Sequence, residues 1–262
     1  RSRGIGHVSR QISFSSYKMH IKSRGIVLTT VRYDDDGQIV HILTETDGCR
    51  AFFVRNTKSR RSGVRARLMQ PLTLVDAEWD QRSPKQDLLH LKTLSVQGWT
   101  SIPFDPVKSG ISLFLAEFLF NALRSEPANG LLFEYVEQSL EWFDTCEDRH
   151  KLANFHIVFL LRMGNFLGFS PNLEEYREGT FFDMRSSTFQ QVRPDHENFL
   201  APAEAALLPK LMRMQYATMH LFRFSGAQRS RLLEFACDYY RLHVAGFNRL
   251  KSLDVLREVY SD

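Results

Sequence analysis

Short runs of alternating apolar and polar residues fill the first part of the chain. The runs are residues 23–30, 39–45, 49–55, 72–80 and 88–96. Turn-forming residues separate them, and Asp47-Gly48 between two alternating runs is typical of a β-hairpin, because both residues accept a positive φ. Five strands of this length within about 75 residues predict a small closed β-barrel.

The spacing of the apolar residues changes after Pro103 and Pro106. From there on, they recur at the spacing typical of amphipathic helices. The predicted helices are residues 109–126, 129–145, 149–169, 202–214, 228–244 and 252–260. Ser109 or Ser112 is the expected N-cap of the first helix. The run at 149–169 is apolar nearly all round, which predicts the central, buried helix of a bundle.

A stretch around residues 172–200 interrupts the predicted helices. Within it, residues 179–192 are expected to form a small β-hairpin over a Ser-rich turn. The fold class is therefore predicted to be α+β with two domains. The first is a five-stranded barrel over residues 19–103, and the second is an all-α helical bundle with a β-hairpin insertion over residues 104–262.

Residues 1–18 differ from the rest in composition, since they hold four basic residues, several Ser and no acidic residue. An organellar transit peptide can have this composition. A disordered extension, or a remnant of an upstream sequence before Met19, is the favoured interpretation. The fold prediction therefore starts at Met19.

The overall composition sets only wide limits. A formal net charge of +4 permits an anionic partner without requiring one, and 43% apolar residues are enough to bury a core. The three cysteines lie far apart with no CxxC pair, which argues against a disulfide framework or a Cys-rich zinc site and favours a reducing cytosol. The sequence has no apolar stretch of the length that a membrane-spanning helix needs.

The segment from residue 50 to residue 67 carries the candidate chemistry. Its cations are Arg50, Arg55, Lys58, Arg60, Arg61, Arg65 and Arg67, and it has no acidic residue. Small polar residues separate the cations without a helical apolar period, which predicts a basic loop beside one face of the barrel. Such a loop can bind phosphates and release counterions from DNA. The alternative is a solvated basic loop that binds nothing.

Aromatic residues in the predicted strands are the candidates for base stacking. Barrels of the OB-fold bind single strands through loops and an aromatic face, and Phe52 and Phe53 precede the basic loop. Successive strand residues point to opposite faces, so one of the two is expected in the core and the other could stack on a base. Trp79 shares a face with Val75 and Ala77, which predicts a core residue.

Four segments together resemble the RecO family of bacterial recombination mediators. They are GIVLTTVRYDDDGQIVHILTETDG (25–48), RLMQPLTLVDAEW (67–79), FHIVFLLRMGNFLGFSPNL (155–173) and HVAGFNRLKSLDVLREVY (243–260). The family pattern has an Arg- and Lys-rich loop between the first two segments, as this chain does. The resemblance covers residues 19–260, and the order and spacing of the segments make it specific.

The resemblance implies a protein without a catalytic centre or a cofactor, located in the bacterial cytoplasm near the nucleoid. It would bind single- and double-stranded DNA, anneal complementary strands, and work with RecR to load RecA onto DNA coated by single-strand-binding protein. The acidic, Phe-ended C-terminal tail of single-strand-binding protein would enter an apolar groove of the helical domain. The family's DNA-binding cations would correspond to Arg55 and to the five cations from Lys58 to Arg67.

The chain departs from many family members at residues 174–177. Those members have four Cys after this point and bind structural zinc, whereas this chain has Glu174, Glu175, Tyr176 and Arg177 there. No metal is therefore expected. The hairpin is predicted to hold by packing of aromatic and apolar side chains instead, namely Phe181, Phe182, Phe189 and Val192.

Two other classes of function remain open on the sequence. One is a protein-interaction scaffold whose OB barrel does not bind DNA directly. The other is an unrecognised hydrolase or nuclease, although the sequence has no nucleophile elbow and no phosphate-cradling glycine motif. Asp34, Asp35 and Asp36 before Gly37 are interpreted as a turn, and His156 and Cys237 as core residues.

Overall fold

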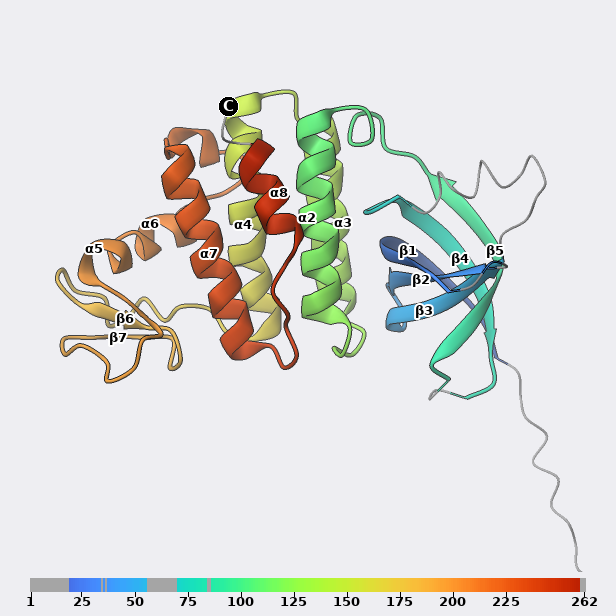
Figure 1. Ribbon diagram of the computed structural model, residues 1–262, viewed down its shortest axis with the longest axis horizontal. Coiled ribbons are helices and arrows are strands. Elements are labelled where there is room, and N and C mark those ends of the chain that lie inside the picture. The colour runs from blue at the N-terminus through green and yellow to red at the C-terminus, as the bar shows by residue number, and fades with distance from the viewer. Residues whose placement is uncertain (1–18, 34, 36, 56–69, 84–85, 260–262) are drawn as a thin grey trace, which may run out of the picture.

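The structure is a computed structural model that describes residues 19–33, 35, 37–55, 70–83 and 86–259. Figure 1 shows a β-barrel at the right, a group of long helices in the middle and a small sheet at the left. The predicted fold class, with an N-terminal barrel followed by helices and a hairpin insertion, is confirmed.

Five strands close into the barrel in the order β1-β2-β3-β5-β4, as predicted for an OB-type barrel. They are β1 (Met19–Arg32), β2 (Gly37–Thr44), β3 (Gly48–Arg55), β4 (Leu74–Gln81) and β5 (Leu88–Gln97). Four of the pairings are antiparallel, whereas β3 and β5 run parallel. A register shift in β1 between Val27 and Thr29 bends this strand, because the extra residue of a bulge increases local twist.

Inward-facing residues of all five strands fill the barrel. They are Val27, Val40, Ile42, Phe52, Val54, Val75, Ala77, Trp79 and Leu89. Trp79 is fully buried, as predicted, and meets the ring of Phe52 edge to face at a centroid distance of 5.3 Å. These two rings supply much of the apolar area of the barrel core.

Helices form the second part of the structure. Their bounds are α2 (Pro106–Leu123), α3 (Gly130–Thr145), α4 (Arg149–Leu167), α5 (Pro202–Ala205), α6 (Leu208–Arg213), η1 (Met219–Leu221), α7 (Gly226–His243) and α8 (Ser252–Val259). Among the described residues, no helix combines the length and the apolar character that crossing a bilayer requires.

Two helix predictions need correction. The N-cap of α2 is Asp105, not Ser109 or Ser112, because its carboxylate accepts hydrogen bonds from the N–H groups of Val107 and Lys108 and Pro106 starts the first turn. The predicted helix 202–214 is two helices, α5 and α6. Pro209 lacks an N–H and fits only the first turn of a helix, so a new helix starts beside it.

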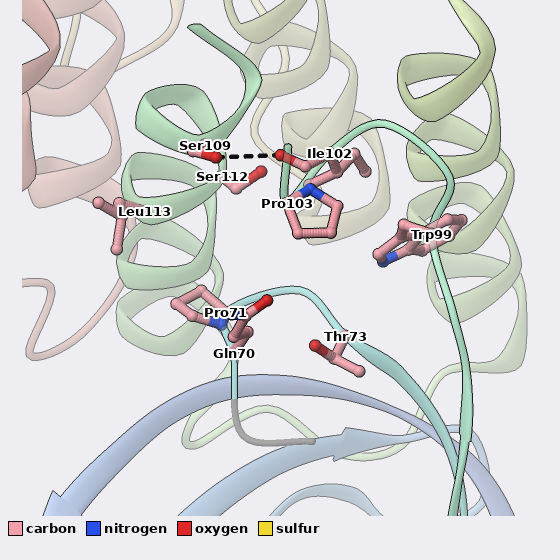
Figure 2. Close-up of a pocket in the computed structure, with 9 residues that line it drawn as sticks. All are labelled: Gln70, Pro71, Thr73, Trp99, Ile102, Pro103, Ser109, Ser112 and Leu113. Carbon is pink, nitrogen blue, oxygen red and sulfur yellow. Dashed lines mark hydrogen bonds between the residues drawn. The ribbon is translucent and has the colours of Figure 1, made fainter. Parts of the chain in front are cut away.

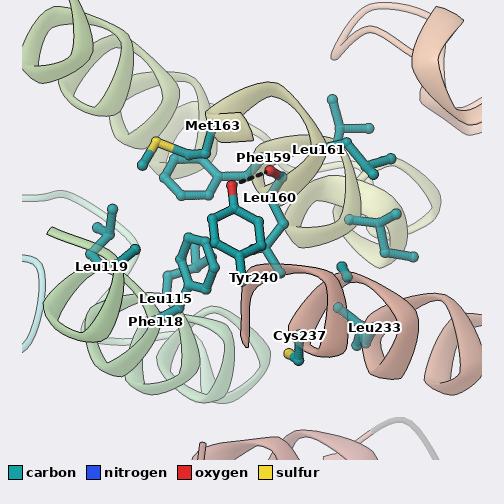
Figure 3. Packing of buried hydrophobic residues seen from close by; sticks show 14 of the residues in the cluster. Leu115, Phe118, Leu119, Phe159, Leu160, Leu161, Met163, Leu233, Cys237 and Tyr240 are labelled. Atoms are coloured by element: carbon teal, nitrogen blue, oxygen red, sulfur yellow. Dashed lines mark hydrogen bonds between the residues drawn. The ribbon is translucent and has the colours of Figure 1, made fainter. Parts of the chain in front are cut away.

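Helix α4 lies at the centre of the helical domain, as predicted. Figure 3 shows Tyr240 of α7 pointing between α2 and α4, where its hydroxyl donates to the carbonyl oxygen of Leu160 at 2.7 Å. Cys237 and His156 are buried core residues, as interpreted from the sequence. Burial, with the nearby charge of Arg229, lowers the pKa of His156 to about 3, so its ring is neutral at physiological pH.

The insertion holds a three-stranded sheet of β6 (Phe181–Asp183), β7 (Thr188–Gln190) and β8 (Phe199–Leu200). Phe182 and Phe189 are buried and anchor the sheet against α7, where Phe182 meets Phe235 and Tyr239. Val192 was expected to join this packing, but it is 77% exposed because it lies beyond β7, which ends at Gln190.

The barrel and the helical domain share one apolar core. Ile26, Leu28 and Leu43, which face outward from the barrel, belong to the same buried cluster as the helices. At the edge of this contact the guanidinium of Arg24 bonds Glu45 at 2.9 Å and also Glu137 of α3. The hydrogen bond to Glu45 and the two carboxylate charges raise the pKa of Arg24 further above its ordinary value.

The carboxylate of Asp144, at the end of α3, holds the linker between the domains. It accepts hydrogen bonds from the N–H groups of Thr100, Ser101 and Ile102 at 2.8, 2.8 and 2.9 Å. Burial alone would raise the pKa of Asp144, but the hydroxyl of Thr100 and these N–H groups outweigh it and lower the pKa to about 2. The linker is thereby fixed through a carboxylate that must stay charged.

We expect this carboxylate to set part of the acid sensitivity of the protein. Its pKa in the folded state is depressed from 3.8, so its stabilisation is present above pH 4 and is lost as the pH falls through about 2. The difference corresponds to about 2 kcal/mol of unfolding free energy. Urea denaturation from pH 5 to pH 2 should show a smaller pH-dependent loss for Asp144→Asn than for the unchanged protein. Asp238→Asn, which removes a half-exposed carboxylate of α7 away from the linker, is the matched control.

Candidate nucleic-acid interface

The structure describes two of the seven cations that the sequence predicted to bind DNA. Arg55 is exposed and ends β3, opposite Gly37 of β2. Arg50 is engaged inside the protein, since its Nε lies 3.1 Å from Asp47 and its Nη2 donates to the carbonyl oxygen of Gln86 at 2.7 Å. Arg55 can therefore reach a ligand at this edge of the barrel, whereas Arg50 has only 17% of its side chain exposed.

The other five predicted cations lie outside the described residues. They are Lys58, Arg60, Arg61, Arg65 and Arg67. In the sequence they follow Arg55 directly and precede Gln70, the next described residue. Their DNA-binding role stays a prediction.

The two phenylalanines of β3 have opposite environments. Phe52 is fully buried in the barrel core, so its ring is not available to a base. Phe53 is half-buried on the outer face. Of the two candidates for base stacking, only Phe53 lies where a ligand can reach it.

Two exposed rings flank Phe53, and sequence reasoning missed both. Tyr33, the residue after β1, lies 5.9 Å from the ring of Phe53 at an interplanar angle of 81°. His90 of β5 lies 5.8 Å away on the other side at 78°. The strand order places the three rings in a line across the sheet, and we call them the ring row (Tyr33, Phe53 and His90).

Gly37 of β2 allows the ring of Phe53 to lie close to the backbone of β2. A Cβ atom at position 37 would lie 2.4 Å from Cζ of Phe53, far inside van der Waals contact. Ile39, two residues further along β2, pairs with Phe53 and with Val31 of β1, which is 52% exposed. The ring row thus lies on an apolar strip of the outer barrel face.

The helical domain covers the other end of the same face. His41 of β2 packs against Phe120 of α2 at 4.7 Å, and burial lowers the pKa of His41. Cys49 of β3 packs against the helical core, and Leu43 is part of it. One end of the outer face is therefore buried between domains, and the end with the ring row is open.

The surface where β1 meets β4 differs from the edge with Arg55, because it carries ion pairs between cations and carboxylates. Lys22 of β1 has its Nζ 2.6 Å from Glu78 of β4, and Lys92 of the neighbouring strand β5 has its Nζ 2.7 Å from Asp80 of β4. Paired charges attract a phosphate chain weakly. The edge that carries Arg55 is the better candidate for an anionic ligand.

Figure 2 shows a cavity of about 220 Å³ between the barrel and α2. Its lining residues are Gln70, Pro71, Thr73, Trp99, Ile102, Pro103, Ser109, Ser112 and Leu113. The hydroxyl of Ser109 is occupied by a hydrogen bond to the carbonyl oxygen of Ile102 at 3.0 Å. The lining has no charged side chain, so this cavity lacks the cations that favour phosphate binding.

A larger cavity of about 500 Å³ lies at the start of α4 and is called here the α4–α7 cavity. It is lined by Asp148, His150, Ala153, Asn154, His220, Phe222, Arg223, Phe224 and Arg229. The side chain of Asn154 holds its shape by donating to the carbonyl oxygens of Met219 and Phe222. Two arginines against one aspartate give its lining a positive balance around two phenylalanine rings.

The sequence predicted that the chain binds no metal ion, so the positions of its acidic and His side chains matter here. Within the described ranges, no group of three or more His, Cys, Asp or Glu side chains is arranged to hold a metal ion. Asp34 and Asp36 are outside those ranges. Asp35 forms an ion pair with Arg32.

Comparison with known proteins gives two family matches that together span most of the chain. Recombination protein O N terminal matches residues 19–97, and Recombination protein O C terminal matches residues 103–254. The DNA repair protein RecO of Phocaeicola vulgatus is 48% identical over 92% of this chain and 99% of its own length. Those of Bacteroides fragilis and Azobacteroides pseudotrichonymphae are 46% and 33% identical over similar spans.

The two phenylalanines of β3 should respond very differently to truncation. Phe52→Ala removes a fully buried ring and leaves a cavity beside Trp79, so we expect a loss of about 3–5 kcal/mol of unfolding free energy. Phe53→Ala removes a half-buried ring from the outer face and should cost clearly less. Urea denaturation of both variants measures the difference. Equal losses would mean that Phe53 is also a core residue.

Proposed function

We propose that this chain, which belongs to the RecO family of DNA repair proteins, is a recombination mediator. It would bind single- and double-stranded DNA. It would anneal complementary strands and, with RecR, help to load RecA onto DNA coated by single-strand-binding protein. It would act by binding alone, without catalysis or a cofactor, in the bacterial cytoplasm close to the nucleoid. The observation that supports this best is the barrel face left open by the helices, at whose edge Arg55 begins the basic segment.

The basic segment supplies the electrostatic part of the proposal. Arg55 and the five cations from Lys58 to Arg67 stand within 13 consecutive positions that contain no acidic residue. Arginine offers a planar fork of donors that matches two phosphate oxygens. Each neutralised phosphate releases counterions, so binding through this segment must weaken as salt rises.

Replacing Arg60 and Arg61 together with Ala should weaken DNA binding for every sequence tested. The slope of the logarithm of affinity against the logarithm of salt concentration should fall by roughly one for each lost phosphate contact. Fluorescence anisotropy with labelled single-stranded DNA at several salt concentrations measures this slope. Lys210→Ala with Arg213→Ala, which removes two exposed cations from α6 on the far side of the molecule, is the matched control.

Two results would contradict the proposal. Unchanged affinity and slope in the Arg60 and Arg61 double variant would favour a scaffold whose barrel does not bind DNA directly. Turnover of labelled DNA with Mg²⁺ or Mn²⁺ that follows the purified protein would show a nuclease.

The proposed partner of the helical domain is the acidic, Phe-ended tail of single-strand-binding protein. The α4–α7 cavity suits such a tail, because Phe222 and Phe224 can contact a terminal ring while Arg223 faces acidic side chains. The N-terminal end of α4 adds a partial positive charge at His150. The cavity between α6 and α7 is lined mainly by leucines, and Arg231 at its rim is already paired with Glu204 at 2.7 Å.

Arg223→Ala should weaken binding of a tail peptide by about tenfold or more, because a charge-assisted hydrogen bond is lost. Calorimetric titration with the peptide measures this. Arg177→Ala, which removes an exposed arginine near the small sheet, should have no effect. Unchanged peptide affinity in Arg223→Ala would place the tail elsewhere on the helical domain.

A further inference from the structure

We infer that the ring row stacks on unpaired bases and makes the barrel face prefer a single strand over a duplex. This inference rests on the proposed DNA-binding function. Two of its residues, Tyr33 and His90, were not suggested by the sequence. Their rings would make the protein bind single-stranded DNA more tightly than double-stranded DNA.

The arrangement of the rings is the first argument. Both outer rings stand nearly perpendicular to Phe53, at 81° and 78°, and lie on either side of it. Each outer ring therefore meets Phe53 in an edge-to-face contact, and the three rings lie next to one another on the open face. Successive bases of one strand can stack on neighbouring rings of this kind.

The exposure of the row is the second argument. Tyr33 is 62% exposed, and His90 is exposed as well. Neither ring has a role in the barrel core, which Phe52 and Trp79 fill. An aromatic and apolar strip on the surface of a protein marks a binding site more often than a scattered single side chain does.

The charge around the row identifies the occupant as a nucleic-acid strand. Arg55 lies at the same end of the face, because its partner in β2 is Gly37 and the ring of Phe53 covers that glycine. The basic segment continues from Arg55 in the sequence. Of the described acidic residues near these rings in the sequence, Asp35 is paired with Arg32, whereas Asp87, three residues before His90, is exposed. Rings beside the exposed guanidinium of Arg55 fit bases joined by phosphates better than they fit an apolar protein surface.

The preference for an unpaired strand follows from where each form of DNA carries its bases. In a duplex the base faces are covered by their neighbours in the stack, and the phosphates are outside. The cations of the basic segment can serve both forms, whereas the ring row can serve only a strand whose bases are free. The rings thus set the ratio of the two affinities.

The test compares four ligands of equal length: oligothymidylate, a strand of the same length with abasic sites, a mixed-sequence single strand and its duplex. Tyr33→Ala combined with His90→Ala should lower affinity for both base-bearing single strands by about tenfold or more. Affinity for the duplex and for the abasic strand should stay within about twofold, with the salt slope unchanged, since no fixed positive charge is lost. Anisotropy titrations at several salt concentrations give all of these values.

Two controls separate the rings from other effects. Tyr33→Phe keeps the ring and should retain the affinity of the unchanged protein for single strands. Phe104→Ala removes an aromatic ring that is 73% exposed but lies in the linker before α2, and it should change nothing. Both positions in the double variant are exposed, so the fold is expected to persist, and a urea denaturation curve checks this.

The inference fails if the double variant weakens all four ligands equally, or none of them, while the unchanged protein binds DNA. A loss restricted to the duplex would also overturn it. If the unchanged protein binds none of the four ligands, the proposed function itself fails, and the ring row is left as a site for a protein partner.

Discussion

The burial of Ile26, Leu28 and Leu43 among the helices decides what the rest of the molecule can do. These residues face outward from the barrel, so an isolated barrel would expose them to water. Docking on α2 and α3 removes them from solvent and covers one end of the outer face. The helices leave the other end of this face uncovered, and that end carries the exposed rings and Arg55. The position of the candidate interface is thus a consequence of the domain contact.

The polar groups around this contact give it a defined geometry. Apolar packing alone tolerates sliding, but Asp144 bonds three successive N–H groups of the linker and Arg24 bonds carboxylates from both domains. Directional bonds of this kind fix one orientation, since a shift leaves buried polar groups without partners. Burial raises the pKa of Glu137 in spite of the charge of Arg24, which shows how far this carboxylate has been withdrawn from water.

The sequence predicted the elements that depend on local pattern. Alternation identified all five strands, and it also assigned Trp79 to the core. It could not identify Tyr33, because the bulge between Val27 and Thr29 changes which side chains of β1 face outward. His90 reaches Phe53 only through the parallel pairing of β3 with β5, a contact between distant segments that no local pattern contains. The sequence did hold a clue for the start of α2, since Asp105-Pro106 is a cap followed by a first-turn proline.

The last helix is held by a residue from far earlier in the chain. The carboxylate of Glu117, in α2, accepts hydrogen bonds from the N–H groups of Lys251 and Ser252 at 2.9 and 2.8 Å, and so supplies the cap of α8. During synthesis on the ribosome, α2 is complete long before these partners emerge. Without α8 the carboxylate of Glu117 lacks the two N–H donors that it has in the folded protein. Closure of the helical domain on this side therefore depends on a contact between residues 134 positions apart in the chain, and α8 gains its cap only when α2 is already in place.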